Sequence, residues 1–214
     1  MIHDALQQAV LMGTPEVAAS LTSEHLAQGS GSQDILSDQL LPAMATVGER
    51  FKRNEMFLPQ VLMSAQAMQA AIDVLKPHLT SKSGGRSQRT ILIGTVQGDM
   101  HDIGKNLVRI MLVGAGFEVI DLGVNVSAQA FLEAAENHHP DVVCLSALLS
   151  STMSHMKDVV NTFQQSALRD TKILVGGAPV NREFSDRIGA HGYAPSAPAA
   201  VELVQEICQN QARQ

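Results

Sequence analysis

The fold class is decided by residues Thr90 to Gly123, which read TILIGTVQGDMHDIGKNLVRIMLVGAGFEVIDLG. A short apolar run comes first, an amphipathic stretch follows from about Asp102, and a second β-rich run closes the unit. The alternation continues through SAQAFLEAAENH, DVVCLSAL, SHMKDVVNTFQQSAL, KILVGG, NREFSDRIGA, GYAP and APAAVELVQEICQN. Five strand–helix units predict an α/β fold with a doubly wound, flavodoxin-like, five-stranded parallel sheet. Its strands are expected to be buried on both faces.

The first 78 residues have a different pattern, in which every segment favours helix. Thr14, Pro15 and Gly29 are typical of an N-cap, a first helical turn and a stop signal. Two later segments carry apolar residues at three- and four-residue spacing. Pro42 is expected to kink or restart its helix, whereas Pro59 is close enough to a helix start to be tolerated. The pattern predicts a small antiparallel four-helix bundle.

Between the two patterns lies the segment HLTSKSGGRSQR, from His78 to Arg89. It is polar, rich in Gly and Ser, and without apolar periodicity, which is typical of an interdomain linker. We therefore predict a helical domain over residues 1–78, a linker over 79–89 and an α/β domain over 90–214.

Composition excludes several classes of protein. The chain has 214 residues, 45% of them hydrophobic and 17% charged, which suits a globular protein with a core. Its net charge of −6 argues against a nucleic-acid surface. No apolar run approaches the roughly 20 residues of a membrane span, and the N-terminus does not resemble a signal peptide. Cys144 and Cys208 are expected to be buried thiols rather than a disulfide or a zinc site. A cytoplasmic protein is predicted.

Three unusual segments fall at the expected carboxyl ends of strands, where open α/β sheets bind ligands. They are GDMHDIG after the first strand, SALLSSTM after the third and GGAP after the fourth. Small residues at 146–147, 150–151 and 176–178 are common in tight turns of any α/β protein. Grouped around a histidine, they predict a slot rather than a filled surface.

The histidine of the first segment, His101, has two interpretations. It can be a helix-start histidine whose ring is satisfied by neighbouring backbone. Alternatively, Asp99 accepts a hydrogen bond from one ring nitrogen and leaves the other free as a metal ligand. Asp102 has its own role as an N-cap or first-turn carboxylate.

The other strand ends limit the kind of metal site. A tetrahedral zinc site needs three or four His, Cys or carboxylate ligands, but Ser146, Thr152, Gly176 and Gly177 are poor ones. One protein ligand suffices only if a cofactor supplies the rest. Other α/β sites fit less well: GxGxxG is absent after the first strand. A receiver domain would want an aspartate at Ser146, and a flavodoxin a hydroxyl-rich phosphate loop and aromatic walls.

These residues resemble the cobalamin-binding domains of methyltransferases. The pattern of that family is Asp-x-His-x-x-Gly, then Ser-x-Leu, then Gly-Gly, and here it is matched by residues 99–104, 146–148 and 176–177. The N-terminal part, including RFKRNEMFLPQVLMSAQAM, is similar to the helical cap of the family. The resemblance runs from about Leu6 to about Ile207. It is nearest to the small corrinoid proteins of methanol, methylamine, betaine and aryl-ether demethylation systems.

The resemblance implies a role for each matched residue. His101 would be the lower axial ligand of cobalt, displacing the dimethylbenzimidazole of the cofactor, and Asp99 would hold its other nitrogen. Gly104 would let the displaced nucleotide tail pass. Thr152 stands where methionine synthases have a serine that completes the hydrogen-bonded relay from His and Asp to solvent. The remaining cofactor-binding residues would be Asp102, Ile103, Ser146, Leu148, Ser150, Gly176, Gly177 and Ala197, with Phe51, Leu58 and Val61 of the cap over the upper corrin face. Without the resemblance, the last three would be taken as ordinary core.

The implied function is a methyl shuttle that cycles between cobalt(I) and methylcobalamin. The corrinoid protein would accept a methyl group from a substrate:corrinoid methyltransferase. It would deliver it to a second methyltransferase acting on tetrahydrofolate or on a thiol such as coenzyme M, with a reductive activase as a further partner. No turnover is expected from the chain alone, and the linker would act as a hinge. The alternatives are a cobalamin-dependent sensor, which normally adds a DNA-binding segment, and a mutase small subunit, which usually lacks the cap.

Overall fold

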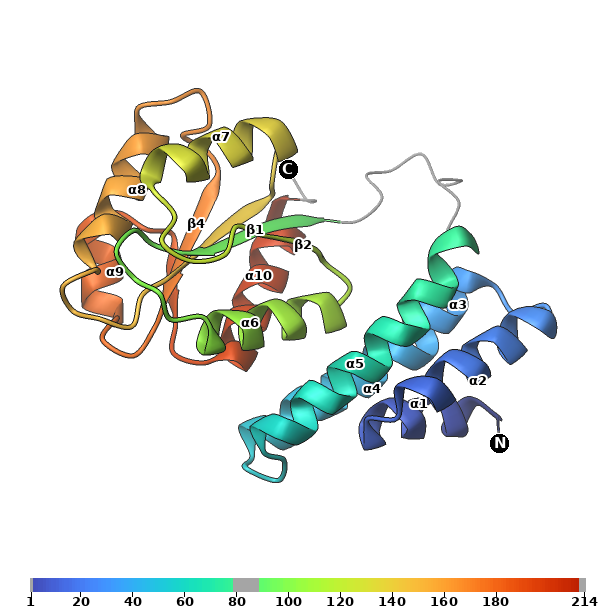
Figure 1. The fold of residues 1–214 in the computed structure, drawn as a ribbon. Helices are drawn as coiled ribbons and strands as arrows, with labels where there is room; N and C mark the ends of the chain where they lie inside the picture. The colour runs from blue at the N-terminus through green and yellow to red at the C-terminus, as the bar shows by residue number, and fades with distance from the viewer. Residues whose placement is uncertain (1, 79–88, 212–214) are drawn as a thin grey trace. The chain divides into compact units, whose positions relative to one another are not determined.

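The computed structural model describes residues 2–78 and 89–211 (Figure 1). They form two compact units, a helical one within residues 2–78 and an α/β one that begins at residue 89. Apart from His78 and Arg89, the predicted linker lies outside the described residues. Within the described ranges, no helix has both the length and the apolar character needed to cross a membrane.

The helical unit is a bundle around a core that includes Leu6, Val47, Met68 and Leu75. The predicted start and stop of its second helix are confirmed, since that helix begins at Pro15 and ends two residues before Gly29. Thr14 occupies the N-cap position, but its hydroxyl donates to the carbonyl of Ala9 instead of capping. The elements are α1 (Ile2–Met12), α2 (Pro15–Ala27), α3 (Ser32–Ile35), the π-helical η1 (Leu36–Leu40), α4 (Leu41–Lys52), α5 (Leu58–Leu75) and the 3₁₀ turn η2 (Lys76–His78).

Two prolines of the helical unit, Pro42 and Pro59, test the predictions made for them. Pro42 is in the first turn of α4, directly after the π-helical turn η1, and Pro59 is in the first turn of α5. A proline in the first turn removes an N–H that has no helical partner in any case. This reason applies to Pro59, whereas Pro42 lies in a continuous helical run at the point where it changes from the π-helical η1 to α4.

The α/β unit has the predicted sheet. All neighbouring strands are parallel, and their order is β2-β1-β3-β4-β5, which is the doubly wound flavodoxin-like order. The elements are β1 (Thr90–Thr95), α6 (Ile103–Gly114), β2 (Glu118–Asp121), α7 (Ala128–His138), β3 (Val142–Ser146), α8 (Ser154–Gln164), β4 (Lys172–Gly176), α9 (Arg182–Ile188), β5 (Gly192–Ala194) and α10 (Ala197–Gln211).

The sheet lies between two layers of helix. The helices α7, α8 and α9 pack on one face in a core that includes Leu92, Val143 and Phe163, while α6 and α10 lie on the other (Figure 1). The prediction of strands buried on both faces is wrong for β2, where Glu118 and Asp121 are exposed. As the edge strand, β2 pairs on one side only and the helices cover it incompletely. Cys144 and Cys208 are free and buried, as predicted.

Candidate functional site

The carboxyl ends of four strands meet in one row at the edge of the sheet. Thr95 of β1 is in register with Ser146 of β3, Ser146 with Gly176 of β4, and Gly176 with Ala194 of β5. The three unusual segments of the sequence follow directly from this row. The fold therefore gathers residues about 80 positions apart at the edge where parallel sheets bind ligands.

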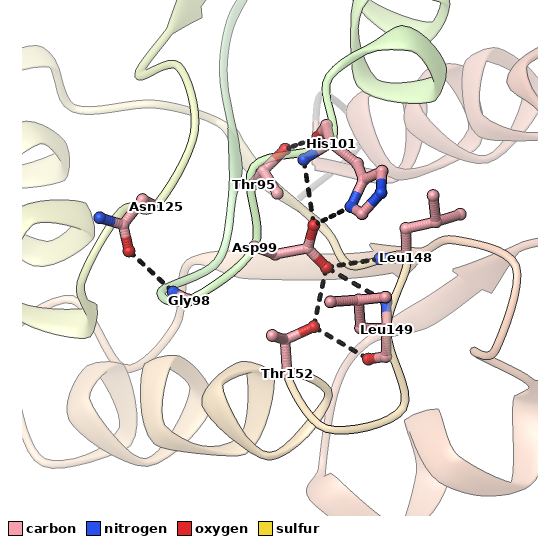
Figure 2. Close-up of polar contacts among 8 residues, drawn as sticks. All are labelled: Thr95, Gly98, Asp99, His101, Asn125, Leu148, Leu149 and Thr152. Atoms are coloured by element: carbon pink, nitrogen blue, oxygen red, sulfur yellow. Dashed lines mark hydrogen bonds and ion pairs between the residues drawn. The ribbon is translucent and has the colours of Figure 1, made fainter.

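His101 lies between the end of β1 and the start of α6 (Figure 2). Its ring Nδ1 is 2.7 Å from Oδ1 of Asp99, and the same oxygen accepts the backbone N–H of His101 at 3.1 Å. A carboxylate only accepts hydrogen bonds, so Nδ1 is the donor in this bond and Nε2 takes no part in it. The side chain is about half exposed, at 49%. The imidazole is thus oriented as a ligand, with its second nitrogen available.

Asp99 is completely buried, and its other oxygen is held from the β3 side of the site. Oδ2 accepts the backbone N–H groups of Leu148 at 2.8 Å and Leu149 at 3.2 Å, and the hydroxyl of Thr152 at 2.7 Å. Figure 2 shows these bonds converging on the carboxylate. Both oxygens have their acceptor capacity engaged, so the carboxylate is rigid.

The charge of Asp99 follows from this environment. Burial raises the pKa of the carboxyl, but the hydrogen bonds from Leu148, Thr152 and His101 outweigh that effect and hold its pKa well below the usual range. Asp99 is therefore ionised at neutral pH. An ionised partner on Nδ1 fixes the orientation of the imidazole ring.

Thr152 ends the chain of hydrogen bonds that begins at His101. Its side chain is buried, and Oγ1 also lies 2.9 Å from the carbonyl oxygen of Leu149. A hydroxyl has one proton, so it donates to the carboxylate or to this carbonyl at any moment. The threonine reaches the carboxylate at the position where the resemblance implies a serine.

A cavity of about 560 Å³ opens beside His101 between β1, β3, β4 and the helices α6 and α10. Its walls are largely apolar, and its polar residues include Lys105, Ser146 and Ser196. It is lined by Ile93, Met100, His101, Asp102, Ile103, Gly104, Lys105, Leu107, Val108, Cys144, Leu145, Ser146, Ala147, Leu148, Leu174, Val175, Gly176, Gly177, Ala178, Tyr193, Ala194, Pro195, Ser196, Ala197 and Ala200.

Gly177 shows why the slot needs small residues. Its φ is +131°, and an added Cβ would stand 1.8 Å from the carbonyl oxygen of Ala147. Only glycine allows the β3 and β4 ends to approach this closely. Gly104 differs, because a Cβ there would meet no atom within 4 Å and would face open space. The first glycine shapes the wall, and the second keeps the mouth wide.

The mouth of the cavity has an apolar rim. Met100 is 68% exposed, Ile103 71% and Leu148 43%, and all three line the cavity around His101. Exposed apolar side chains grouped around one polar side chain are typical of a binding surface rather than of ordinary surface.

The structure brings most of the predicted α/β residues together at this cavity, with three exceptions. Asp99 and Thr152 lie behind His101 as its support, and Ser150 is exposed in the turn before α8, outside the lining. Asp102 precedes α6 and accepts a hydrogen bond from the side chain of Asn106 at 3.1 Å. Those that line the cavity are His101, Asp102, Ile103, Gly104, Ser146, Leu148, Gly176, Gly177 and Ala197.

The three predicted cap residues lie on two helices of the helical unit. Phe51 is near the end of α4, and Leu58 and Val61 are in the first turn of α5, after an intervening loop. No single helix runs through them, as Pro59 indicated. Val61 is completely buried, whereas Phe51 and Leu58 are half-buried.

Two features of the site were missed at the level of sequence. Lys105, only 3% exposed, pairs with both carboxylate oxygens of Asp121 at 2.6 and 2.7 Å. The available sequence signal was an acidic residue, Asp121, at the end of β2, together with Lys105 in the first turn of α6. The second is the pair of backbone N–H groups that bind Asp99, for which side-chain identities give no signal.

Within residues 2–78 and 89–211, no group of three or more His, Cys, Asp or Glu side chains is arranged to hold a metal ion. In that part of the chain His101 would bind a metal as one ligand among others supplied by a cofactor.

Comparisons with known proteins relate both units to proteins that bind vitamin B12. The family described as B12 binding domain matches residues 89–202, and a second family of the same description matches residues 2–76. A corrinoid protein of Desulfitobacterium hafniense is 39% identical over 207 residues, covering 95% of this chain and 96% of that protein. A trimethylamine corrinoid protein of Methanosarcina mazei is 40% identical over 191 residues, 88% of each chain.

A solved structure is similar over nearly the whole chain. It is the methanol:cobalamin methyltransferase complex of Methanosarcina barkeri, of which one chain matches with a TM-score of 0.87 and 27% identity. The match covers 97% of this chain and 80% of that one.

Proposed function

We propose that this chain, which belongs to the B12-binding family of corrinoid proteins, is the methyl-carrying subunit of a methyltransferase system. When bound, the corrinoid supplies a cobalt centre that accepts a methyl group and passes it on. The observation that carries the proposal is the His101–Asp99 pair, with Nδ1 bonded to a buried carboxylate and Nε2 available at the mouth of an apolar cavity.

The residues present fit a corrinoid bound through histidine. His101 would be the lower axial ligand through Nε2. Asp99 would hold the ring in place from Nδ1, and Thr152 and the backbone N–H groups of residues 148 and 149 would fix that carboxylate in turn. The exposed rim of Met100, Ile103 and Leu148 suits a large, flat and mostly apolar ring.

The cavity fits the nucleotide tail that the histidine would displace. Its volume of about 560 Å³ is in the range of small-molecule sites, and its walls are largely apolar, as an aromatic base requires. Ser146 and Ser196 offer hydroxyls for polar groups of the tail. Gly104 leaves open space at the mouth through which the tail would pass.

The chain would act as a carrier rather than as a complete enzyme. Asp99 is ionised and both its oxygens are engaged, so it is not available as a general base toward a substrate. Activation of the methyl donor would therefore come from a substrate:corrinoid methyltransferase. A second methyltransferase would transfer the group to tetrahydrofolate or to a thiol such as coenzyme M, and a reductive activase would restore the reduced cofactor. Residues 1–78 would serve as the helical cap and residues 90–214 as the cobalamin-binding domain.

The ligation is tested by electron paramagnetic resonance of the protein reconstituted with hydroxocobalamin and reduced to cobalt(II). We expect coupling to one imidazole nitrogen, and this coupling should change when the protein carries ¹⁵N-histidine. An unchanged coupling in the labelled protein would exclude His101 as the ligand.

The carrier role is tested with the fully reduced holoprotein and stopped-flow spectroscopy. Methyl iodide, which needs no activation, should methylate the corrinoid directly. Methylamines, betaines, methanol and methoxylated aromatics should leave it unmethylated until a separate methyltransferase is added. Repeated turnover of any of these donors by the chain alone would overturn the proposal.

A further inference from the structure

Asn125, in the β2–α7 loop (residues 122–127), contacts the segment that carries His101. Its side-chain Oδ1 accepts the backbone N–H of Gly98 at 2.8 Å, and its own backbone N–H donates to the carbonyl oxygen of Asp99 at 2.9 Å (Figure 2 shows the first bond). The two bonds from one residue bracket the Gly98–Asp99 peptide. Asn125 therefore fixes the backbone from which the Asp99 carboxylate projects.

This backbone needs an external support. Gly98 has a φ of +79°, in the left-handed region, and glycine has more conformational freedom than any other residue. The Asp99 side chain is held from the β3 side by residues 148–152. On the β2 side, the bonds from Asn125 restrain the chain between Gly98 and Asp99, so that carboxylate and backbone are fixed from opposite directions.

Asn125 can act as a support because its own loop is anchored. The carbonyl of Gly123 accepts the N–H of Thr95 at 3.0 Å, and the N–H of Val126 donates to the carbonyl of Thr95 at 3.0 Å. The loop is also tied to the start of α6, because Asp121 accepts the N–H of Gly123 at 2.9 Å and pairs with the buried Lys105. The end of β1, which precedes His101, and the start of α6, which follows it, are thus both connected to this loop.

The identity of the residue matters for two reasons. Asn125 has a φ of +55°, which asparagine tolerates better than most residues. Its side-chain amide also supplies a carbonyl oxygen that is close enough to accept the N–H of Gly98. Glycine would keep the backbone conformation without the acceptor, and aspartate would keep both.

We propose that Asn125 is a positioning residue for the axial histidine, holding Gly98 and Asp99 so that His101 presents Nε2 to the corrinoid. The proposal rests on the proposed function for the identity of the ligand that the histidine binds. The effect of Asn125 on the conformation of residues 98–101 does not depend on the proposed function, because it exists without the cofactor.

The experiment compares three variants with the wild type. Asn125→Gly removes the acceptor, Asn125→Asp retains it, and Asn54→Gly is a matched control. Asn54 is a second asparagine in the left-handed region, with a φ of +59°, in the helical unit. Because Asn125 is exposed, its replacement leaves the core intact, and thermal unfolding checks that each variant is folded. Asn125→Ser, which shortens the side chain, replaces Asn125→Gly if that variant does not fold.

The first readout uses the protein without cofactor. In Asn125→Gly, the amide proton of Gly98 should exchange faster and the ring nitrogen signals of His101 should shift and broaden. Asn125→Asp and Asn54→Gly should retain the wild-type signals. If Asn125→Gly also retains them, Asn125 does not position this segment and the proposal is wrong.

The second readout is the fraction of cobalt(II) centres coupled to a histidine nitrogen after reconstitution with hydroxocobalamin. Loss of one hydrogen bond predicts an equilibrium shift of about threefold toward the uncoupled form in Asn125→Gly, with recovery in Asn125→Asp. An equal fraction in Asn125→Gly and wild type would contradict the proposal. If the wild type itself shows no histidine coupling, the proposed function fails, and the cofactor-free spectra still decide the role of Asn125.

Discussion

The two faces of the sheet are made from the same strands but serve different ends. On the face covered by α7, α8 and α9, alternate strand residues such as Leu92 and Val143 meet the buried Phe131 and Phe163, and the space is filled. On the face covered by α6 and α10, neighbouring strand residues such as Leu174 border a cavity of about 560 Å³. Because strand side chains alternate between faces, one sequence can specify a packed core and a ligand site at the same time.

The difference separates residues that stabilise the fold from residues that shape the site. A filled core loses contacts with every atom removed, whereas side chains along a cavity already lack partners on one side. On the filled face a substitution should therefore change stability and leave cofactor binding intact. On the open face the same substitution should change binding more than stability.

The largest expected effect comes from one substitution made on each face. Leu92 and Leu174 are 0% and 2% exposed and lie on the central strands β1 and β4. Leucine to alanine in a core costs about 2–5 kcal/mol, and the cost rises with the cavity that is left. Leu92→Ala should lie near the upper end and Leu174→Ala near the lower end, as measured by urea unfolding without cofactor. In a titration with hydroxocobalamin, only Leu174→Ala should weaken binding. Equal costs at the two positions would contradict the comparison.

Asp99→Asn tests the buried carboxylate that supports His101 at the mouth of the cavity. Removing the carboxylate that orients a metal-binding histidine typically costs on the order of 10–100-fold in metal affinity or activity. We expect a folded protein with weaker histidine ligation and an altered cobalt reduction potential. The potential is followed by spectroelectrochemistry, with Asp170→Asn, an exposed acid outside the cavity lining, as the control. An unaltered spectrum and midpoint potential would reduce Asp99 to a turn residue.

Gly104→Ala tests whether the glycine at the mouth of the cavity lowers the stability of the protein. The position is the second residue of α6, and a Cβ there meets no atom within 4 Å. Alanine in a compatible helical position stabilises by about 0.4–1 kcal/mol. The cofactor-free variant should therefore be slightly more stable in thermal unfolding, while its affinity for hydroxocobalamin falls. Tighter binding together with higher stability would show that the tail does not pass Gly104.

The smallest effect is expected from pH, at a site remote from the cavity mouth. His191 precedes β5, and its Nδ1 accepts the backbone N–H of Ile173 at 3.0 Å. Partial burial, and then the charge of Lys172, lower the pKa of His191 below its usual value. The unfolded chain therefore binds a proton more readily than the folded one. Stability should rise with pH through the unfolded value of about 6.5 and be lost as pH falls below it.

This pH dependence is measured by urea unfolding across pH 5 to 8. His191→Asn keeps an acceptor for Ile173 and removes the titrating group, so the slope between pH 5 and 7 should become shallower. A slope identical to that of the wild type would assign the dependence to other groups.

Several parts of the molecule followed from local sequence. The strand–helix alternation from Thr90 onward predicted a doubly wound parallel sheet, because amphipathic stretches of helical length separate the short β-rich runs. Pro15 and Pro59 marked helix starts because proline has a place in a first helical turn and little in a helix interior. The Asp99–His101 pair could be interpreted directly, since the two residues are close in sequence and their bond is local.

Contacts between distant residues depended on the tertiary structure. The low pKa of Asp99 comes largely from Leu148 and Thr152, about 50 residues later, and two of the bonds involve backbone N–H groups that every residue other than proline has. The incomplete burial of β2 depended on its place at the sheet edge, and the support from Asn125 on the approach of two loops. The sequence by itself determined which elements form and predicted which side chain would be the ligand. Only the tertiary structure decided how that ligand is held, because hydrogen bonds across a sheet depend on distances that local periodicity does not encode.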